Sequence, residues 1–104
     1  MNVKFDVEKI IKSKSNLSVA RKYHEIDNVE RIEIKKANSD HYRIEGIVKT
    51  KTDSFDCYVI CDEFGRVKKY SCDCYFCNEN SPCAHIGAVL LKVNNLHIKS
   101  IPYS

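Results

Sequence analysis

Four residues in the second half of the chain have the types and the spacing of metal ligands. They are three cysteines and one histidine: Cys72, Cys74, Cys83 and His85. Thiolate sulfur and imidazole nitrogen are donors that suit zinc, and a structural zinc ion takes about four of them in a tetrahedron. Cys72 and Cys74 are two residues apart, so on a strand both side chains leave the same face. The pattern predicts one Zn²⁺ per chain, bound by these four side chains.

The spacing of the second ligand pair restricts where the following helix begins. Within a helix, residues two positions apart point about 200° away from each other, so Cys83 and His85 could not both reach one ion. The helix is therefore expected to begin around Cys83 to Ala84, with Cys83 on the entering chain. Pro82 is compatible with such an entry.

A further cysteine leaves an alternative ligand set open. Cys74 and Cys77 form a C-x-x-C, which zinc knuckles and redox dithiols both use. The alternative set is Cys74, Cys77, Cys83 and His85. A metal-free redox pair would need a βαβ context, which does not precede Cys74. We interpret Cys77 as a loop thiol beside the metal site.

Other apolar and thiol side chains near these ligands have structural interpretations. Tyr75 and Phe76 are expected to cover the site as an apolar lid, because a hydrophobic shell is a normal part of a metal site. The alternative is that they are exposed for stacking or for contact with a partner. Cys57 and Cys61 alternate along one strand face with Phe55, so they are interpreted as buried structural thiols.

The periodicity of apolar residues indicates the elements that position the site. Two short helices are expected in the first quarter, the second capped by Asn16. Apolar residues then recur with a period of two, and turn-forming clusters separate four strands, at about 29–35, 42–48, 55–61 and 66–72. Ile86, Val89, Leu90 and Val93 follow the i, i+3, i+4, i+7 spacing of a last helix, for which Asn94-Asn95 is a plausible stop.

Together these elements predict the fold class and the domain organisation. The fold is expected to be α+β: an antiparallel four-stranded meander with N-terminal helices, and a C-terminal helix joined to the last strand by the zinc site. Residues 1–104 are expected to form one domain, with the metal-binding finger at 71–93 and the helix and sheet at 6–70. On metal removal the C-terminal part is expected to loosen while the sheet keeps some structure.

The Cys-x-Cys, short loop and Cys-x-His running into an Ile-x-Ala-Val-Leu-Leu helix resemble a SWIM zinc finger over residues 71–93. The preceding helix and strands resemble the module that carries this finger at the N-terminus of bacterial Snf-type DNA-translocating ATPases. The resemblance implies that Cys72, Cys74, Cys83 and His85 bind zinc, and it implies DNA binding or protein contact. The chain departs from the family pattern at Lys22, where glycine is common, and at Ala84, where Lys or Arg is frequent.

Composition excludes several other classes of protein. With 104 residues and 12.0 kDa, the chain suffices for one small core. Four of its six cysteines fall within the twelve positions 72–83 instead of spreading as a disulfide framework would. The N-terminus has no apolar signal core, and no apolar run approaches the roughly 18 residues of a membrane span. A cytoplasmic location without membrane contact is therefore expected.

Charge and motifs narrow the function. The formal net charge is +3, and basic residues collect in the first 23 positions and around the finger. Most runs of charge are only solvated faces. Some of these basic residues could nevertheless form a stripe that contacts phosphates: Arg66, Lys68, Lys69 and Lys92. Four protein ligands close a zinc shell, and the chain has neither G-x-x-x-x-G-K-[ST] nor G-x-S-x-G, so neither an enzyme nor a small-molecule substrate is expected.

The expected function is that of a non-catalytic zinc module that binds DNA or a partner. The resemblance implies an accessory domain of a DNA-translocating ATPase, which would itself lie elsewhere in a parent protein or on a partner chain. The alternative is a protein-interaction or autoregulatory module that does not contact nucleic acid. DNA binding should weaken steeply as salt is raised, whereas protein contact should tolerate salt.

Overall fold

The computed structural model describes residues 4–25, 28–74, 77 and 82–97. These residues form three helices and four strands. In chain order they are α1 (Val7–Ile10), α2 (Lys14–Glu25), β1 (Val29–Lys36), β2 (His41–Lys49), β3 (Ser54–Asp62), β4 (Val67–Cys72) and α3 (Ala84–His97).

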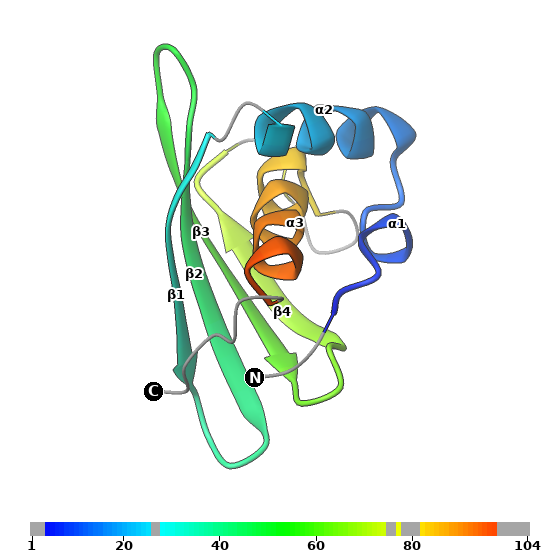
Figure 1. The fold of residues 1–104 in the computed structure, drawn as a ribbon, viewed down its shortest axis with the longest axis vertical. Helices are drawn as coiled ribbons and strands as arrows, with labels where there is room; N and C mark the ends of the chain where they lie inside the picture. The colour runs from blue at the N-terminus through cyan, green and yellow to red at the C-terminus, as the bar shows by residue number, and fades with distance from the viewer. Residues whose placement is uncertain (1–3, 26–27, 75–76, 78–81, 98–104) are drawn as a thin grey trace.

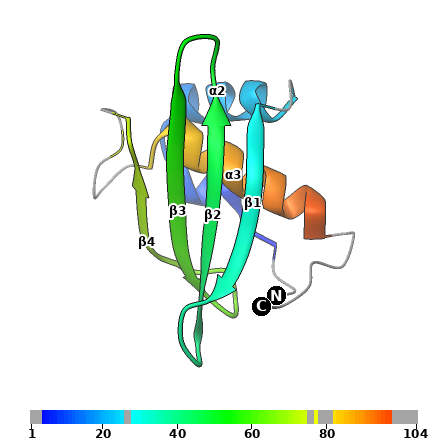
Figure 2. The same ribbon diagram turned by 90° about the vertical axis from the view of Figure 1, so that its left-hand side faces the viewer.

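The four strands form one antiparallel sheet in the order β1-β2-β3-β4, which confirms the expected meander and the α+β class. All three helices lie on one face of the sheet, and α3 runs across it between α2 and α1 (Figure 1). The view onto the sheet shows its other face without helices (Figure 2). That open face carries charged pairs such as Lys35–Glu45, at 3.1 Å, and the Arg43 guanidinium lies 4.0 Å from the centre of the Tyr58 ring.

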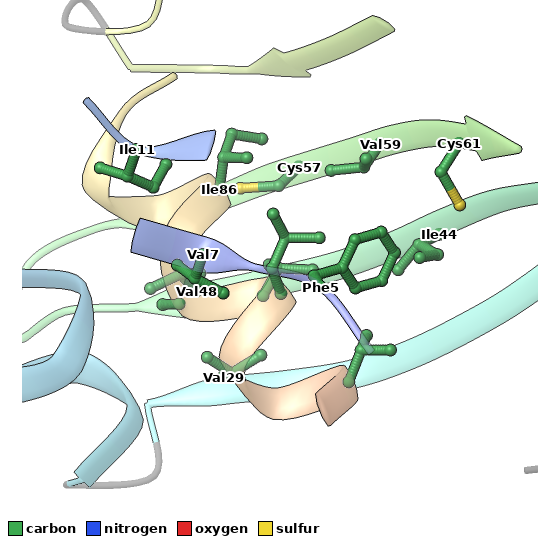
Figure 3. Packing of buried hydrophobic residues seen from close by; sticks show 14 of the residues in the cluster. Phe5, Val7, Ile11, Val29, Ile44, Val48, Cys57, Val59, Cys61 and Ile86 are labelled. Atoms are coloured by element: carbon green, nitrogen blue, oxygen red, sulfur yellow. The ribbon is translucent and has the colours of Figure 1, made fainter. Parts of the chain in front are cut away.

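The core fills the space between α3 and the inner face of the sheet (Figure 3). The four apolar residues that predicted the last helix are completely buried: Ile86, Val89, Leu90 and Val93. Alternate strand residues meet them, including Ile44, Val48 and Val59, also completely buried. The period-two and period-3.6 patterns therefore identified the two surfaces that pack together.

Two glycines permit the close approach of α3 to its neighbours. A Cβ built on Gly87 would lie 2.8 Å from the Cβ of Ala20, which places α2 directly against the first turns of α3. A Cβ built on Gly46 of β2 would lie 3.0 Å from Cγ2 of Val89. Both distances are shorter than the roughly 3.5–4.0 Å at which carbon atoms attract best, so larger side chains would push α3 away.

Two helix boundaries differ from the sequence-based expectation. Ser13, not Asn16, caps α2, because its Oγ accepts a hydrogen bond from the Asn16 backbone N–H at 3.2 Å. The helix α3 does not stop at Asn94-Asn95 but continues to His97. The Asn94 amide makes two hydrogen bonds with the backbone of Phe5, of 2.7 and 2.9 Å, so it does not compete for the backbone of its own helix.

Both outer strands contain an irregularity in pairing. In β1 the register with β2 shifts between Glu30 and Glu33, and Arg31 there has a positive φ of 50°. In β4 the register with β3 shifts so that Cys61 pairs with Val67 while Ile60 pairs with Lys69. Lys68 is therefore the extra residue of a β-bulge.

Candidate metal centre

The structure brings together the four residues of the first predicted ligand set. One donor atom from each of Cys72, Cys74, Cys83 and His85 lies within 4.8 Å of all the others. Nδ1 of His85 is 3.6 Å from Sγ of Cys72 and 3.7 Å from Sγ of Cys83. In a tetrahedral zinc site with bonds of about 2.3 Å to sulfur and 2.05 Å to nitrogen, these ligands are about 3.6 Å apart. The separations of the histidine nitrogen from the Cys72 and Cys83 sulfurs therefore match those of a tetrahedral shell.

The bulge in β4 turns Cys72 toward the helices. Continuing the Cys61–Val67 pairing without the extra residue would place Ser71 opposite Cys57 on the inner face. With Lys68 inserted, Cys72 takes that place instead. Bulges commonly re-aim side chains in this way. Cys72 and Cys74 were expected to lie on one strand. The strand β4 ends at Cys72, however, so Cys74 lies just beyond it.

The start of α3 supplies the other half of the site, as the spacing of Cys83 and His85 predicted. The helix begins at Ala84, which leaves Cys83 on the entering chain. The Cys83 carbonyl still accepts a hydrogen bond from the Gly87 N–H at 3.2 Å, so the residue is fixed to the first turn. Both Cys83 and His85 are buried, at 1% and 7% exposure. A thiolate at this position also gains from the helix dipole.

Two aromatic rings hold the His85 imidazole between them. Phe55 of β3 stacks on it with ring centres 4.3 Å apart, and Tyr23 of α2 stacks with centres 5.3 Å apart. The sequence did not predict this arrangement, because Tyr23 and Phe55 lie far from His85 in the chain. The expected lid residues Tyr75 and Phe76 lie outside the described residues.

The surroundings of Cys72, Cys83 and His85 shift each pKa in the direction that favours the neutral side chain. Contact with the Cys57 thiol, together with burial, raises the pKa of Cys72, and contact with Cys72, together with burial, raises the pKa of Cys83. Burial lowers the pKa of His85, which keeps the imidazole neutral at physiological pH. Thiolates bind metal and thiols do not, so a cation that enters this cluster must displace thiol protons.

The remaining cysteines fall into three environments. Cys77 lies beside Cys83 and Cys74, and burial raises its pKa to about 12, but it is not one of the four mutually close donors. Cys57 is buried as predicted, yet its sulfur lies 3.4 Å from Sγ of Cys72, a contact the sequence analysis did not foresee. Cys61 is completely buried in the core, and burial raises its pKa to about 11.

The basic residues proposed for nucleic-acid contact lie in two places: Arg66, Lys68 and Lys69 at the β3–β4 turn and on β4, and Lys92 on α3. Lys68 and Lys69 line a single groove of about 460 Å³ along β4, which ends at Cys72 and Cys77. Lys92 lies on α3, among residues that do not line this groove.

Arg66 and Lys68 both approach a buried carboxylate. Nε of Arg66 lies 2.6 Å, and Nζ of Lys68 3.9 Å, from Oδ2 of Asp62. Burial opposes ionisation of Asp62, but hydrogen bonds from Arg66 and the Phe64 backbone N–H outweigh it and lower the pKa to about 2. Part of the basic charge at the β3–β4 turn is therefore already neutralised.

Fold and site together define a small α+β domain with a Cys₃His cluster between its last strand and last helix, of the composition and spacing that bind a metal ion. Comparisons with protein-family models, with curated proteins and with solved structures find no match. Among the described residues, no helix is both long and apolar enough to cross a membrane.

Proposed function

We propose that this chain is a structural zinc module, in which one Zn²⁺ bound by Cys72, Cys74, Cys83 and His85 joins β4 to α3. The observation that carries the proposal is the convergence of three sulfurs and a buried histidine within 4.8 Å of one another, with Nδ1 at 3.6 and 3.7 Å from two of the sulfurs. Three thiolates and one imidazole match the preference of zinc over harder cations. Four protein donors close the shell, which suits a structural ion and not a catalytic one.

The ion would stabilise the packing of α3, the element that supplies more buried core residues than any other described element. Because α3 begins at the site and packs against α2 and the sheet, fixing its first turn fixes the whole helical layer (Figure 1). Structural zinc in small units contributes on the order of 10 kcal/mol at neutral pH. That is comparable to the whole stability of a typical domain. Loosening on metal removal should therefore spread beyond the C-terminal part.

Metal content of single variants tests the proposal. Reduced protein should contain close to one zinc per chain, and Cys72→Ser and Cys83→Ser should each lose most of it. Cys77→Ser is the matched control, since Cys77 lies in the same cluster but outside the set of four donors. The visible spectrum of the cobalt-substituted protein should show tetrahedral thiolate coordination. Absence of metal from reduced wild-type protein would refute the proposal, and loss in Cys77→Ser with retention in Cys72→Ser would establish the alternative ligand set.

We further propose that the module contacts DNA phosphates through Lys68 and Lys69. The supporting observation is that both line one groove beside the metal centre, with the Tyr58 and Tyr70 rings in its walls. The resemblance to SWIM modules suggests the same partner and, with it, a role as an accessory domain of a DNA-translocating ATPase. The contact would be electrostatic, with little base specificity.

A paired-lysine comparison separates DNA contact from protein contact. Replacing Lys68 and Lys69 together by alanine should weaken DNA binding at low salt and reduce the dependence of log K on log salt by about 2. The control is Lys35→Ala/Lys36→Ala, an adjacent lysine pair on the opposite edge strand β1. Equal affinity of both variants would remove the support for DNA contact. Absence of DNA binding together with salt-tolerant partner capture would favour the protein-interaction module.

A further inference from the structure

A thiol outside the proposed ligand set lies in direct contact with a ligand. Sγ of Cys57 on β3 is 3.4 Å from Sγ of Cys72 on β4. This is shorter than the roughly 3.8 Å expected between two sulfur ligands of one tetrahedral zinc ion. Cys57 is nevertheless not one of the mutually close donors, so it is a neighbour of the ligand and not a fifth ligand.

The sheet holds these two cysteines directly opposite each other. Cys57 and Cys72 are register partners, and the adjacent pair is hydrogen-bonded, since the Asp73 N–H donates to the Asp56 carbonyl at 3.3 Å. Hydrogen-bonded and non-hydrogen-bonded pairs alternate in an antiparallel ladder, so Cys57–Cys72 is a non-hydrogen-bonded pair with Cα atoms about 4.5 Å apart. That separation lies within the roughly 4.4–6.8 Å that disulfides span.

The two thiols differ in access from solvent. Cys72 is partly exposed and lines the groove beside β4, whereas Cys57 is 4% exposed and does not line it. A small oxidant should therefore reach Cys72 before Cys57, which is almost completely buried and lines a separate groove on β1, β2 and β3. This is the usual arrangement of an attacked thiol and a resolving thiol.

We propose that hydrogen peroxide converts Cys57 and Cys72 into a cross-strand disulfide, which withdraws Cys72 from the metal site. The Cys72 sulfur attacks one peroxide oxygen, the O–O bond breaks, and the leaving hydroxide takes up the Cys72 thiol proton to become water. The Cys57 sulfur then attacks the Cys72 sulfenic sulfur, and the hydroxyl leaves with the Cys57 proton as a second water. The two sulfurs lose two electrons in total, the peroxide gains them, and a thiol reductant reverses the change.

The disulfide would leave Cys74, Cys83 and His85 as the only members of the ligand set. The sulfurs need to approach from 3.4 Å to about 2.05 Å, a shift that the paired strands allow but that takes the Cys72 sulfur out of the tetrahedron. Metal release on oxidation rests on the proposed zinc function. Formation of the disulfide does not, because the strand pairing alone brings the sulfurs together.

Peptide mapping of the oxidised full chain tests the proposal. The protein is treated with hydrogen peroxide, blocked with N-ethylmaleimide at low pH and digested with trypsin without reduction. Tryptic cleavage places Cys57 in peptide 52–66 and Cys72 in peptide 70–92. We expect these peptides to be joined, with fragment ions assigning the link to Cys57 and Cys72. A metallochromic chelator should record one metal released per link formed.

Matched variants identify the resolving thiol. Cys57→Ser should abolish the link between the two peptides and slow metal release several-fold. Cys61→Ser is the control, because Cys61 is buried on the same face of β3 but lies opposite Val67 (Figure 3). It should behave as wild type. If Cys57→Ser fails to fold, Cys57→Ala and the fragment ions of wild-type protein still decide the pairing.

Three results would overturn the proposal: a link to Cys61, a link confined to peptide 70–92, or oxidation of Cys72 without any disulfide. Absence of zinc from the reduced protein is a different failure. It would refute the proposed function, while the same digest would still show whether the disulfide forms.

Discussion

Replacing Gly87 by alanine tests how closely α2 and α3 pack, because two effects of opposite sign compete. Alanine is favoured over glycine inside a helix by about 1 kcal/mol. The added methyl group, however, would lie 2.8 Å from the Cβ of Ala20 and 3.1 Å from Cγ1 of Ile11. Both neighbours are buried, at 0% and 2% exposure, so neither can move aside freely.

The structure predicts that the clash prevails. Overpacking by one methyl group costs typically 1–3 kcal/mol, so after the helix-propensity gain Gly87→Ala should lower the free energy of unfolding by about 1 kcal/mol. For a domain of this size, that corresponds to a fall of about 4–8 °C in Tm. Urea unfolding followed by circular dichroism, at one fixed concentration of free zinc, would measure it, because bound metal itself shifts stability.

Two further variants separate the clash from general effects. Asn95→Ala, at an exposed position of the same helix, should raise stability by about half a kcal/mol through helix propensity alone. Ala20→Gly removes the obstructing methyl group, so in the Gly87→Ala background it should cost at least about 1 kcal/mol less than in wild type. Two results together would refute the close packing of α2 on α3: an increase in the free energy of unfolding in Gly87→Ala, and a change in the double variant equal to the sum of the Gly87→Ala and Ala20→Gly changes.

Three other predictions concern the N-terminal segment and the metal centre. Asn94→Ala removes both hydrogen bonds to the Phe5 backbone, so it should lower the free energy of unfolding by about 1–3 kcal/mol. Amide hydrogen exchange at Phe5 should become faster. An unchanged exchange rate at Phe5 would contradict the pairing. Phe55→Leu removes the ring stacked on His85, so it should speed zinc loss to a chelator without changing the zinc stoichiometry. Equal rates of zinc loss in the variant and the wild type would show that stacking does not hold the imidazole. The pKa values of Cys72 and Cys83 are raised, and a cysteine thiol is ordinarily protonated at neutral pH, so zinc binding should release about three protons and the apparent affinity should rise with pH. Calorimetry in buffers of different ionisation enthalpy would count the protons, and a clearly smaller number would contradict this prediction.

The sequence carried enough information to predict the elements and the four side chains that the structure brings together. The period-two alternation of the strands and the spacing of apolar residues from Ile86 to Val93 show which face of each segment is buried. Such a pattern can be recognised within one segment, without knowledge of its neighbours. The separation of two residues between Cys83 and His85 also placed the start of α3 correctly, because helix geometry excludes other solutions.

Features that depend on how two elements pack or pair with each other could not be predicted from the pattern within one segment. Counting back from the β3–β4 turn without a bulge places Ser71 opposite Cys57, and only the extra residue Lys68 brings Cys72 there. The stacking of Tyr23 on His85 depends on how α2 crosses α3, which no local pattern encodes. The sequence pattern around Asn94 is typical of a helix stop. The residue that satisfies its side chain within the helix, Phe5, lies at the other end of the chain, where no local pattern reveals it.

The irregular pairing of the two outermost strands also bears on how the chain behaves at high concentration. A sheet edge is a template for further strands, and a meander leaves two such edges, here β1 and β4. Each contains a register shift, and Lys35 of β1 and Lys68 and Lys69 of β4 add charge there. A bulged, lysine-bearing edge presents an interrupted row of hydrogen-bonding groups to a second copy. The same distortion that aims Cys72 at the metal centre thus also protects the sheet against edge-to-edge aggregation.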